Sequence, residues 1–209
     1  MHNRPMESFR SDTRAEIAAV AARLVVDEGM EYAEAKRRAA RQLGLSSART
    51  PLPDNAELEA AVRDHIAIFC ADTQPGELKV LRELALEWME RLARFSPHLC
   101  GAVWHGSATR HSDLRIRLYC DDPKAAEWAL LDLRVEYHPG TDSDSHGEPV
   151  EALTLRLFSQ PLQQWVLVHL LVHDLRDRRT VRKLDGQGRP SQGNADDVRA
   201  LLAAPQEAA

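Results

Sequence analysis

Hydrophobic residues recur at helical spacing through the first half of the chain. In four stretches the apolar positions lie three or four residues apart, which is the repeat of an α-helix with one buried side. Gly29 and Gly44 end two of these stretches, and Pro97 follows the last, as helix-stopping residues do. The first ten residues have no such pattern and are expected to form a loose tail. The expected helices span residues 12–28, 31–43, 54–70 and 77–95.

The repeat changes after Pro97. Residues 114–120 (LRIRLYC) alternate between apolar and polar side chains, which is typical of a β-strand with one buried face. Pro123 is a favourable first residue for a helix. We therefore expect strands at residues 102–104, 114–120, 134–138, 150–158 and 164–173, a helix at 123–133, and a polar loop at 140–149.

These patterns place the chain in the α+β class. A helical N-terminal region, residues 1–97, precedes a small mixed β-sheet with one or two helices in residues 98–175. Residues 176–209 are expected to form a polar tail that ends in a short helix at 195–203.

Composition and charge narrow the kind of protein. The 209 residues are 44% hydrophobic and 28% charged, which is ordinary for a globular protein and argues against disorder. The net charge of −5 argues against a general nucleic-acid coat protein but leaves a local basic patch open.

Location follows from three further features. Three widely spaced cysteines fit a reducing compartment. No apolar run reaches the roughly 18 residues that span a bilayer, and the first ten residues lack the apolar core of a secretory signal. A cytoplasmic protein with no membrane partner is expected, and its oligomeric state is left open.

One short segment contains residues suited to phosphate and metal binding. Gly106 and Ser107 follow the strand expected at 102–104, and Asp113 opens the strand expected at 114–120. His105 and His111 flank the Gly-Ser pair, where an imidazole can contact a phosphate. Carboxylates that alternate along a strand point to one face, and their oxygens are the ligands that Mg²⁺ prefers.

This order of elements resembles the nucleotidyltransferase superfamily of the polymerase-β type. In that family a Gly-Ser turn holds the nucleotide triphosphate through backbone N–H groups and the serine hydroxyl, and carboxylates on neighbouring strands bind two Mg²⁺ ions. The resemblance implies that Gly106 and Ser107 bind a nucleotide, with His105 and His111 beside it. It also implies that Asp113 is the first catalytic and metal-binding carboxylate.

The family's other carboxylates match less well. Glu151 and Glu136, each on an expected strand, are the candidates for the third carboxylate, and Glu151 would share the metal with Asp113. The position of the second aspartate is occupied by Arg115, and a cation there conflicts with two divalent ions. We therefore expect a degenerate member that binds a nucleotide or nucleic acid in a regulatory or adaptor role. An active Mg²⁺-dependent nucleotidyltransferase is the first alternative.

Less specific interpretations apply to the same residues. A Gly-Ser pair is common in turns for conformational reasons alone, and Glu136 and Glu151 on alternating strands are often exposed to solvent. His169 and His173 have the four-residue spacing of a helical zinc motif, but their run favours a strand and no glutamate follows His169. A structural or surface role is expected for both histidines.

A second alternative assigns the function to the N-terminal helices, as a DNA-binding or protein-interaction module. Residues 16–62 resemble the first helices of the tetracycline-repressor family, which implies DNA binding. The recognition helix would fall on residues 46–53, where two prolines disfavour a helix. The helix expected at 31–43 is basic. Together with the segment GAVWHGSATRHSDLRIRL, it also resembles a group of small proteobacterial proteins. Its outward basic residues are Lys36, Arg37, Arg38 and Arg41.

Overall fold

The computed structural model describes residues 4–46, 50–143, 149–180, 188 and 190–204. The chain folds into two compact units, residues 1–74, called the N-terminal unit, and residues 75–207, called the sheet unit. Each unit contains a hydrophobic core of its own. The boundary lies after Gln74, the first residue of helix α4 (Gln74–Arg91), and the apolar side of α4 belongs to the core of the sheet unit. The sequence had suggested a boundary after residue 97.

The N-terminal unit consists of helices α1 (Arg4–Glu28), α2 (Tyr32–Gln42) and α3 (Asn55–Phe69). Its core is rich in alanine, which lets the helices approach closely. Asp54 begins α3 with a capping box, in which it accepts the N–H of Glu57 while Glu57 accepts the N–H of Asp54. The loose tail expected over the first ten residues is wrong, since α1 already begins at Arg4. Proline is tolerated in a first helical turn, so Pro5 does not prevent this start.

The sheet unit contains a mixed sheet in the order β3-β4-β5-β2-β1-β6, so the expected α+β class is confirmed. Strands β2 and β5 are parallel, and the other pairs are antiparallel. After α4 the elements are η1 (Ala93–Phe95), β1 (His98–Cys100), α5 (Gly101–His105), β2 (Leu114–Cys120), α6 (Lys124–Asp132), β3 (Tyr137–Ser143), β4 (Pro149–Ser159), β5 (Gln164–Asp174), η2 (Leu175–Thr180), β6 (Gln192–Gly193) and α7 (Ala195–Ala203).

Several expected elements are confirmed, and three differ. The strand expected at 102–104 is wrong, because pairing ends at Cys100 and the chain turns into α5. Strand β3 starts at Tyr137 and continues through Gly140 and Thr141, which pair with β4, so part of the expected loop is strand. Residues 144–148 of that loop lie outside the described residues. The helix expected at 195–203 is confirmed as α7. The preceding tail also contributes strand β6, and Val198 of α7 is fully buried, so this part of the chain belongs to the core.

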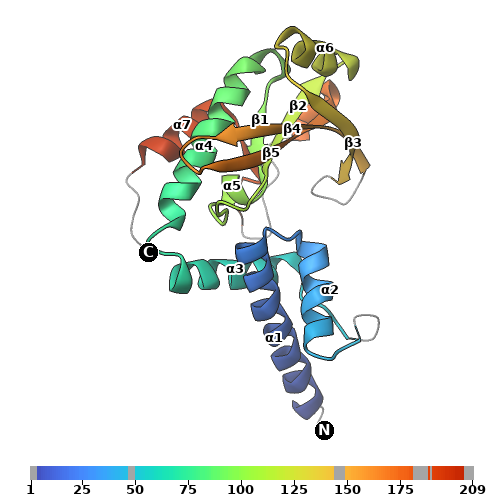
Figure 1. Cartoon of the computed structure of the whole chain (residues 1–209). Coiled ribbons are helices and arrows are strands. Elements are labelled where there is room, and N and C mark those ends of the chain that lie inside the picture. The colour runs from blue at the N-terminus through green and yellow to red at the C-terminus, as the bar shows by residue number, and fades with distance from the viewer. Residues whose placement is uncertain (1–3, 47–49, 144–148, 181–187, 189, 205–209) are drawn as a thin grey trace. The chain divides into compact units, whose positions relative to one another are not determined.

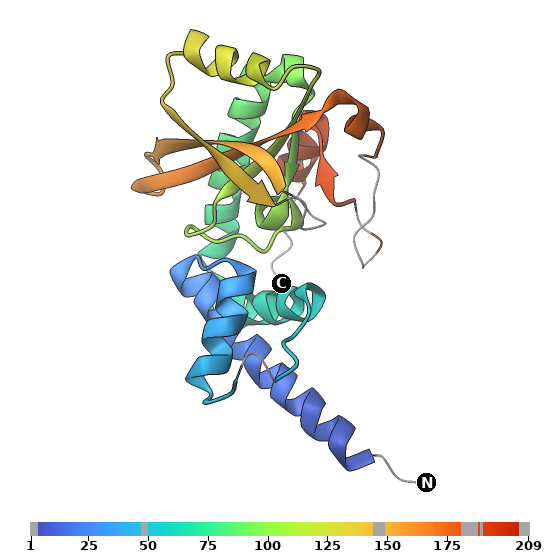
Figure 2. The same cartoon turned by 90° about the vertical axis from the view of Figure 1, so that its right-hand side faces the viewer.

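One face of the sheet is covered by helices. Figures 1 and 2 show α4 lying against the strands, and the core contains residues of α4, α6 and α7 together with alternate residues of β2, β4 and β5. Fully buried members include Leu81, Met89, Leu130, Val198, Ile116, Leu118, Leu153 and Val168. No helix in the described part of the chain combines the length and the apolarity needed to cross a membrane.

The opposite face, called the polar face, is formed by the residues that alternate with this core. The sheet curls toward it, since Arg115 on β2 forms an ion pair with Asp142 on β3, although β5 and β4 lie between these strands. Cys100, Leu171 and Ala152 form a small apolar cluster on this face. The side chains that define the polar face are Asp113 immediately before β2, Arg115 and Arg117 on β2, Thr154, Arg156 and Phe158 on β4, and Trp165, Leu167 and His169 on β5.

Candidate functional site

A row of three hydrogen-bonded side chains crosses the polar face. Nε2 of His169 lies 3.2 Å from Oδ2 of Asp113, and Oγ1 of Thr154 lies 3.1 Å from Nδ1 of His169. Asp113 lies immediately before β2, and His169 and Thr154 lie on β5 and β4, which follow β2 in the order of the sheet. The side chains of His169 and Asp113 are 18% and 37% exposed, so solvent reaches the row.

The hydrogen bonds of this row relate the donor and acceptor roles of the two nitrogens of the His169 imidazole. When Nε2–H donates to Asp113, Nδ1 carries the lone pair and accepts the hydroxyl hydrogen of Thr154. Asp113 then keeps further lone pairs for a ligand, because an ionised carboxylate accepts about four hydrogen bonds. The row offers a bound molecule one carboxylate and one oriented hydroxyl group.

Helix α5 ends at the Gly106–Ser107 pair. The N–H groups of Gly106 and Ser107 both donate to the carbonyl of Ala102, at 2.9 and 3.0 Å. Gly106 has φ +88°, a left-handed conformation that favours glycine at the end of a helix. The two N–H groups that the resemblance assigns to a triphosphate therefore already have an acceptor. His105 is half-buried and His111 is exposed on the loop that follows.

The hydroxyl of Ser107 is buried rather than presented at the surface. The residue is 3% exposed, and among the described residues its Oγ atom has no hydrogen-bond partner. A buried hydroxyl without a partner costs roughly 1–3 kcal/mol relative to a satisfied one.

Hydrogen bonds fix the residues between Ser107 and Asp113 to one another and to other parts of the sheet unit. The hydroxyl of Ser112 accepts the N–H of Thr109 at 3.0 Å, which forms a tight turn. Arg110 donates through its backbone N–H to Glu77 on α4 at 2.9 Å and through its guanidinium to the carbonyl of Leu162 at 2.7 Å. These contacts fix the start of β2, and with it the position of Asp113.

The structure does not bring the expected carboxylates together. Glu151 pairs with Val172, whose side chain is in the core, so Glu151 lies on the opposite face of the sheet from Asp113. Val172 pairs in turn with Leu118, five residues beyond Asp113, a separation of about 16 Å along the strand. Glu136 is exposed and lies one residue before β3, and β4 and β5 lie between β3 and β2 in the order of the sheet.

The described residues therefore do not fit a two-metal centre. Within them, no group of three or more His, Cys, Asp or Glu side chains is arranged to hold a metal ion. Arg115 stands where the resemblance would place a second carboxylate, and its Nη2 atom lies 2.7 Å from Oδ2 of Asp142 on β3. The two side chains are 22% and 24% exposed, so each charge is compensated within the fold.

The far end of the polar face is closed. Gln192 on β6 is 4% exposed and accepts a hydrogen bond from Nη1 of Arg117 at 2.8 Å, while its amide donates to the hydroxyl of Tyr119 at 2.9 Å. Burial raises the pKa values of the Tyr119 hydroxyl and of the Cys100 thiol, and it lowers the pKa of the His98 imidazole. These shifts favour the uncharged forms of all three side chains, whereas Asp113, at the other end of the face, is 37% exposed.

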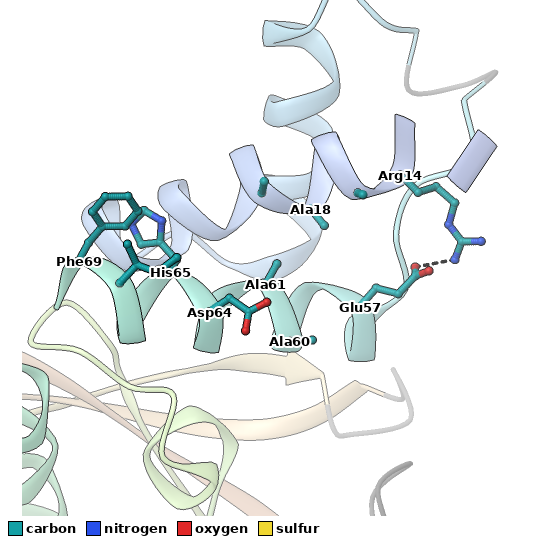
Figure 3. Close-up of a pocket in the computed structure, with 11 residues that line it drawn as sticks. Arg14, Ala18, Glu57, Ala60, Ala61, Asp64, His65 and Phe69 are labelled. Carbon is teal, nitrogen blue, oxygen red and sulfur yellow. Dashed lines mark hydrogen bonds and ion pairs between the residues drawn. The ribbon is translucent and has the colours of Figure 1, made fainter. Parts of the chain in front are cut away.

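The N-terminal unit has a groove of about 780 Å³ between α1 and α3. Figure 3 shows Arg14 and Glu57 joined by an ion pair at one end and Phe69 beside His65 at the other. Five alanines form much of its lining, and Ile68 and Phe69 at its end are each 70% exposed.

The basic side chains of α2 differ in their surroundings. Arg38 pairs with Glu28 at 2.6 Å, and Lys36 donates to Asn55 at 2.8 Å. Arg37 and Arg41 are exposed and have no ion-pair partner among the described residues. The outward orientation expected for this basic helix is therefore clearest at Arg37 and Arg41.

Sequence reasoning missed the contribution of His169 and Thr154. Both occupy polar-face positions of strands whose alternate residues are buried, and this alternation was visible in the sequence. The sequence could not predict that β2 and β5 are neighbours, because these parallel strands are distant in the chain.

Comparison of the chain with models of known protein families and with curated proteins gives no match.

Proposed function

We propose that the sheet unit is a nucleotidyltransferase-like domain that binds a nucleotide on the polar face and does not carry out two-metal transfer. Its role is regulatory or that of an adaptor. The observation that carries the proposal is the Asp113–His169 pair, a solvent-accessible carboxylate held by an imidazole, with Arg115 in the position of a second carboxylate.

The polar groups of the row suit the functional groups of a nucleotide. Ribose hydroxyls and base amino groups are donors, and Asp113 has acceptor capacity beyond its bond to His169. The contact of His105 and His111 with the phosphates stays a prediction, and the exposure of His111 supports it. The closed end of the face, beyond Arg115, limits binding to the end at Asp113.

The first alternative, an active Mg²⁺-dependent transferase, requires a second carboxylate within a few ångströms of Asp113. Glu151 lies on the other face, and Glu136 lies three strands away. Arg115 stands where the resemblance would place the second carboxylate, and its guanidinium is paired with Asp142. Binding without transfer is therefore the function that this geometry supports best.

Thermal unfolding of the full chain with ATP, GTP, CTP or UTP, with and without Mg²⁺, tests the proposal. A nucleotide at about a hundred times its Kd adds roughly 2.7 kcal/mol to the free energy of unfolding and raises the melting temperature. The shift should occur without Mg²⁺ and be lost in Asp113→Asn. The control Asp132→Asn, at an exposed site on α6, should keep it. No shift with any nucleotide contradicts the proposal, and Mg²⁺-dependent transfer to an acceptor would favour the active enzyme.

The exposed arginines of α2 favour a second candidate function, DNA binding by the N-terminal unit. Cations that neutralise phosphates release counterions, so affinity should fall steeply as salt rises. Replacement of both Arg37 and Arg41 by alanine in the full chain should weaken DNA binding and lower the salt slope by about 1 for each lost contact. Arg38→Ala is the control, because Arg38 is paired with Glu28. An unchanged affinity in the double variant would remove this candidate.

A further inference from the structure

The tip of the β4–β5 hairpin exposes aromatic side chains on the polar face. Phe158 and Trp165 are 43% and 53% exposed, and their rings meet edge to face with centroids 5.3 Å apart. The guanidinium of Arg156 lies 4.6 Å from the centroid of the Trp165 ring. Leu167, which is 38% exposed, completes a set of four side chains that we call the hairpin cluster.

This exposure does not result from loose packing of the hairpin. The pairing of β3 with β4 stops at Leu155, and the pairing of β2 with β5 starts at Val168, so the tip extends beyond both neighbouring strands. The other side of the tip is in the core, where Leu162 and Val166 are 6% and 3% exposed. The hairpin is thus anchored on one side and presents apolar rings to solvent on the other, which marks a binding surface.

The hairpin cluster continues directly from the Asp113–His169 pair. Along the two strands the cross-strand pairs follow in order, Thr154 with His169, then Arg156 with Leu167, then Phe158 with Trp165. Each step of two residues is about 7 Å, so the Trp165 ring lies about 13 Å along the face from His169. One ligand of nucleotide size that binds at Asp113 therefore reaches the cluster.

We propose that the base of a nucleotide bound at Asp113 stacks on the hairpin cluster, against Trp165 and the guanidinium of Arg156. This inference rests on the proposed function and adds the base-binding element. Bases stack on aromatic rings and on arginine planes whatever their sequence, which suits a surface with planar groups. Arg156 is the only charged member of the cluster, and its contact with Trp165 shows that a flat cationic group already fits on that ring.

Tryptophan fluorescence distinguishes a nucleotide whose base stacks on Trp165 from a nucleotide that binds at another place. The chain has four tryptophans, and Trp128 on α6 is 63% exposed, which makes Trp128→Leu the matched control for Trp165→Leu. Titration of the full chain with each nucleoside triphosphate should quench the fluorescence of the wild type and of Trp128→Leu. In Trp165→Leu the quenching should disappear and the affinity should fall about 5- to 150-fold, the usual loss for one stacked base. Arg156→Ala should also weaken binding.

A second probe, ribose 5-phosphate, has the sugar and phosphate but no base. It should not quench the wild type, and its effect on melting temperature should be equal in wild type and Trp165→Leu. If nucleotides raise the melting temperature but Trp165→Leu binds them as tightly as the wild type, the stacking inference is overturned while the proposed function stands. Quenching lost in Trp165→Leu but unaffected by Asp113→Asn supports stacking and contradicts the proposed site. Quenching by a single-stranded oligonucleotide alone, or by a protein partner alone, overturns the assignment to a nucleotide.

Discussion

Arg115 on β2 and Asp142 on β3 form an ion pair of 2.7 Å, although β4 and β5 lie between their strands in the sheet. Such a contact requires the sheet to curl so that β3 bends back over the polar face. Asp113, at the start of β2, stays accessible, since its side chain is 37% exposed.

The Arg115–Asp142 pair should therefore be coupled in stability. In a double-mutant cycle with Arg115→Ala and Asp142→Ala, the free energy of unfolding should show a coupling of about 0.5–3 kcal/mol, because both side chains are largely shielded from water. Arg91 and Glu87, an exposed pair on α4, provide the control, with an expected coupling of about 0.3–0.5 kcal/mol. Denaturant unfolding of the variants measures both values. A coupling at Arg115 no larger than that of the control would show that the pair does not hold the curl.

Gly193 on β6 should not tolerate a side chain. A Cβ atom at this position would overlap the ring of Trp104, whose indole N–H donates to the carbonyl of Pro190 at 2.7 Å. Gly193→Ala should destabilise the sheet unit by about 1–3 kcal/mol. Gly76→Ala, in helix α4 with open space around it, should stabilise by about 0.4–1 kcal/mol. Melting temperatures of the two variants should move in opposite directions, and a shift in the same direction would count against this packing.

His98 should make the protein sensitive to mild acid. Burial lowers the pKa of His98, and its Nδ1 atom lies 2.8 Å from the carbonyl oxygen of Ser96. The unfolded chain binds a proton at this residue near pH 6.5, whereas the folded chain binds it only at lower pH. The stability is therefore complete above about pH 6.5 and falls as the pH drops through the interval between the two pKa values. Unfolding free energies measured over this range should depend less on pH in His98→Gln, and equal slopes in the two proteins would contradict the assignment.

The three cysteines should differ in reactivity. Burial raises the pKa values of the Cys100 and Cys120 thiols, which keeps them protonated, whereas Cys70 is only half-buried. The thiolate is the reactive form, so a thiol reagent near pH 8 should modify Cys70 first in the folded protein. Peptide mapping after short labelling identifies the site, and Cys70→Ser should abolish the fast phase. Fast labelling of Cys100 would show that the closed end of the polar face opens.

Local patterns in the sequence determined most of the elements. Strict alternation predicted β2 over the residues that form it, and a helical repeat of apolar residues predicted α3. These features depend on neighbours within one segment, so they survive in any fold that buries the apolar side. The strand expected at 102–104 failed because three apolar residues suit a strand and a helical turn equally well, and the backbone hydrogen bonds of Gly106 and Ser107 to Ala102 decided for the helix.

The site depended on relations between strands, which only the tertiary structure decided. Alternation places Asp113 and Arg115 on one face of β2, but it contains no information on the register of β2 against β5 or on the curl of the sheet. The register places His169 beside Asp113 and Glu151 on the opposite face. The curl supplies Asp142 to Arg115 from a strand that is not adjacent. The sequence by itself thus determined which side chains share a strand face, and the folded sheet determined which of them meet, because pairing is set by packing over the whole core and not by local spacing.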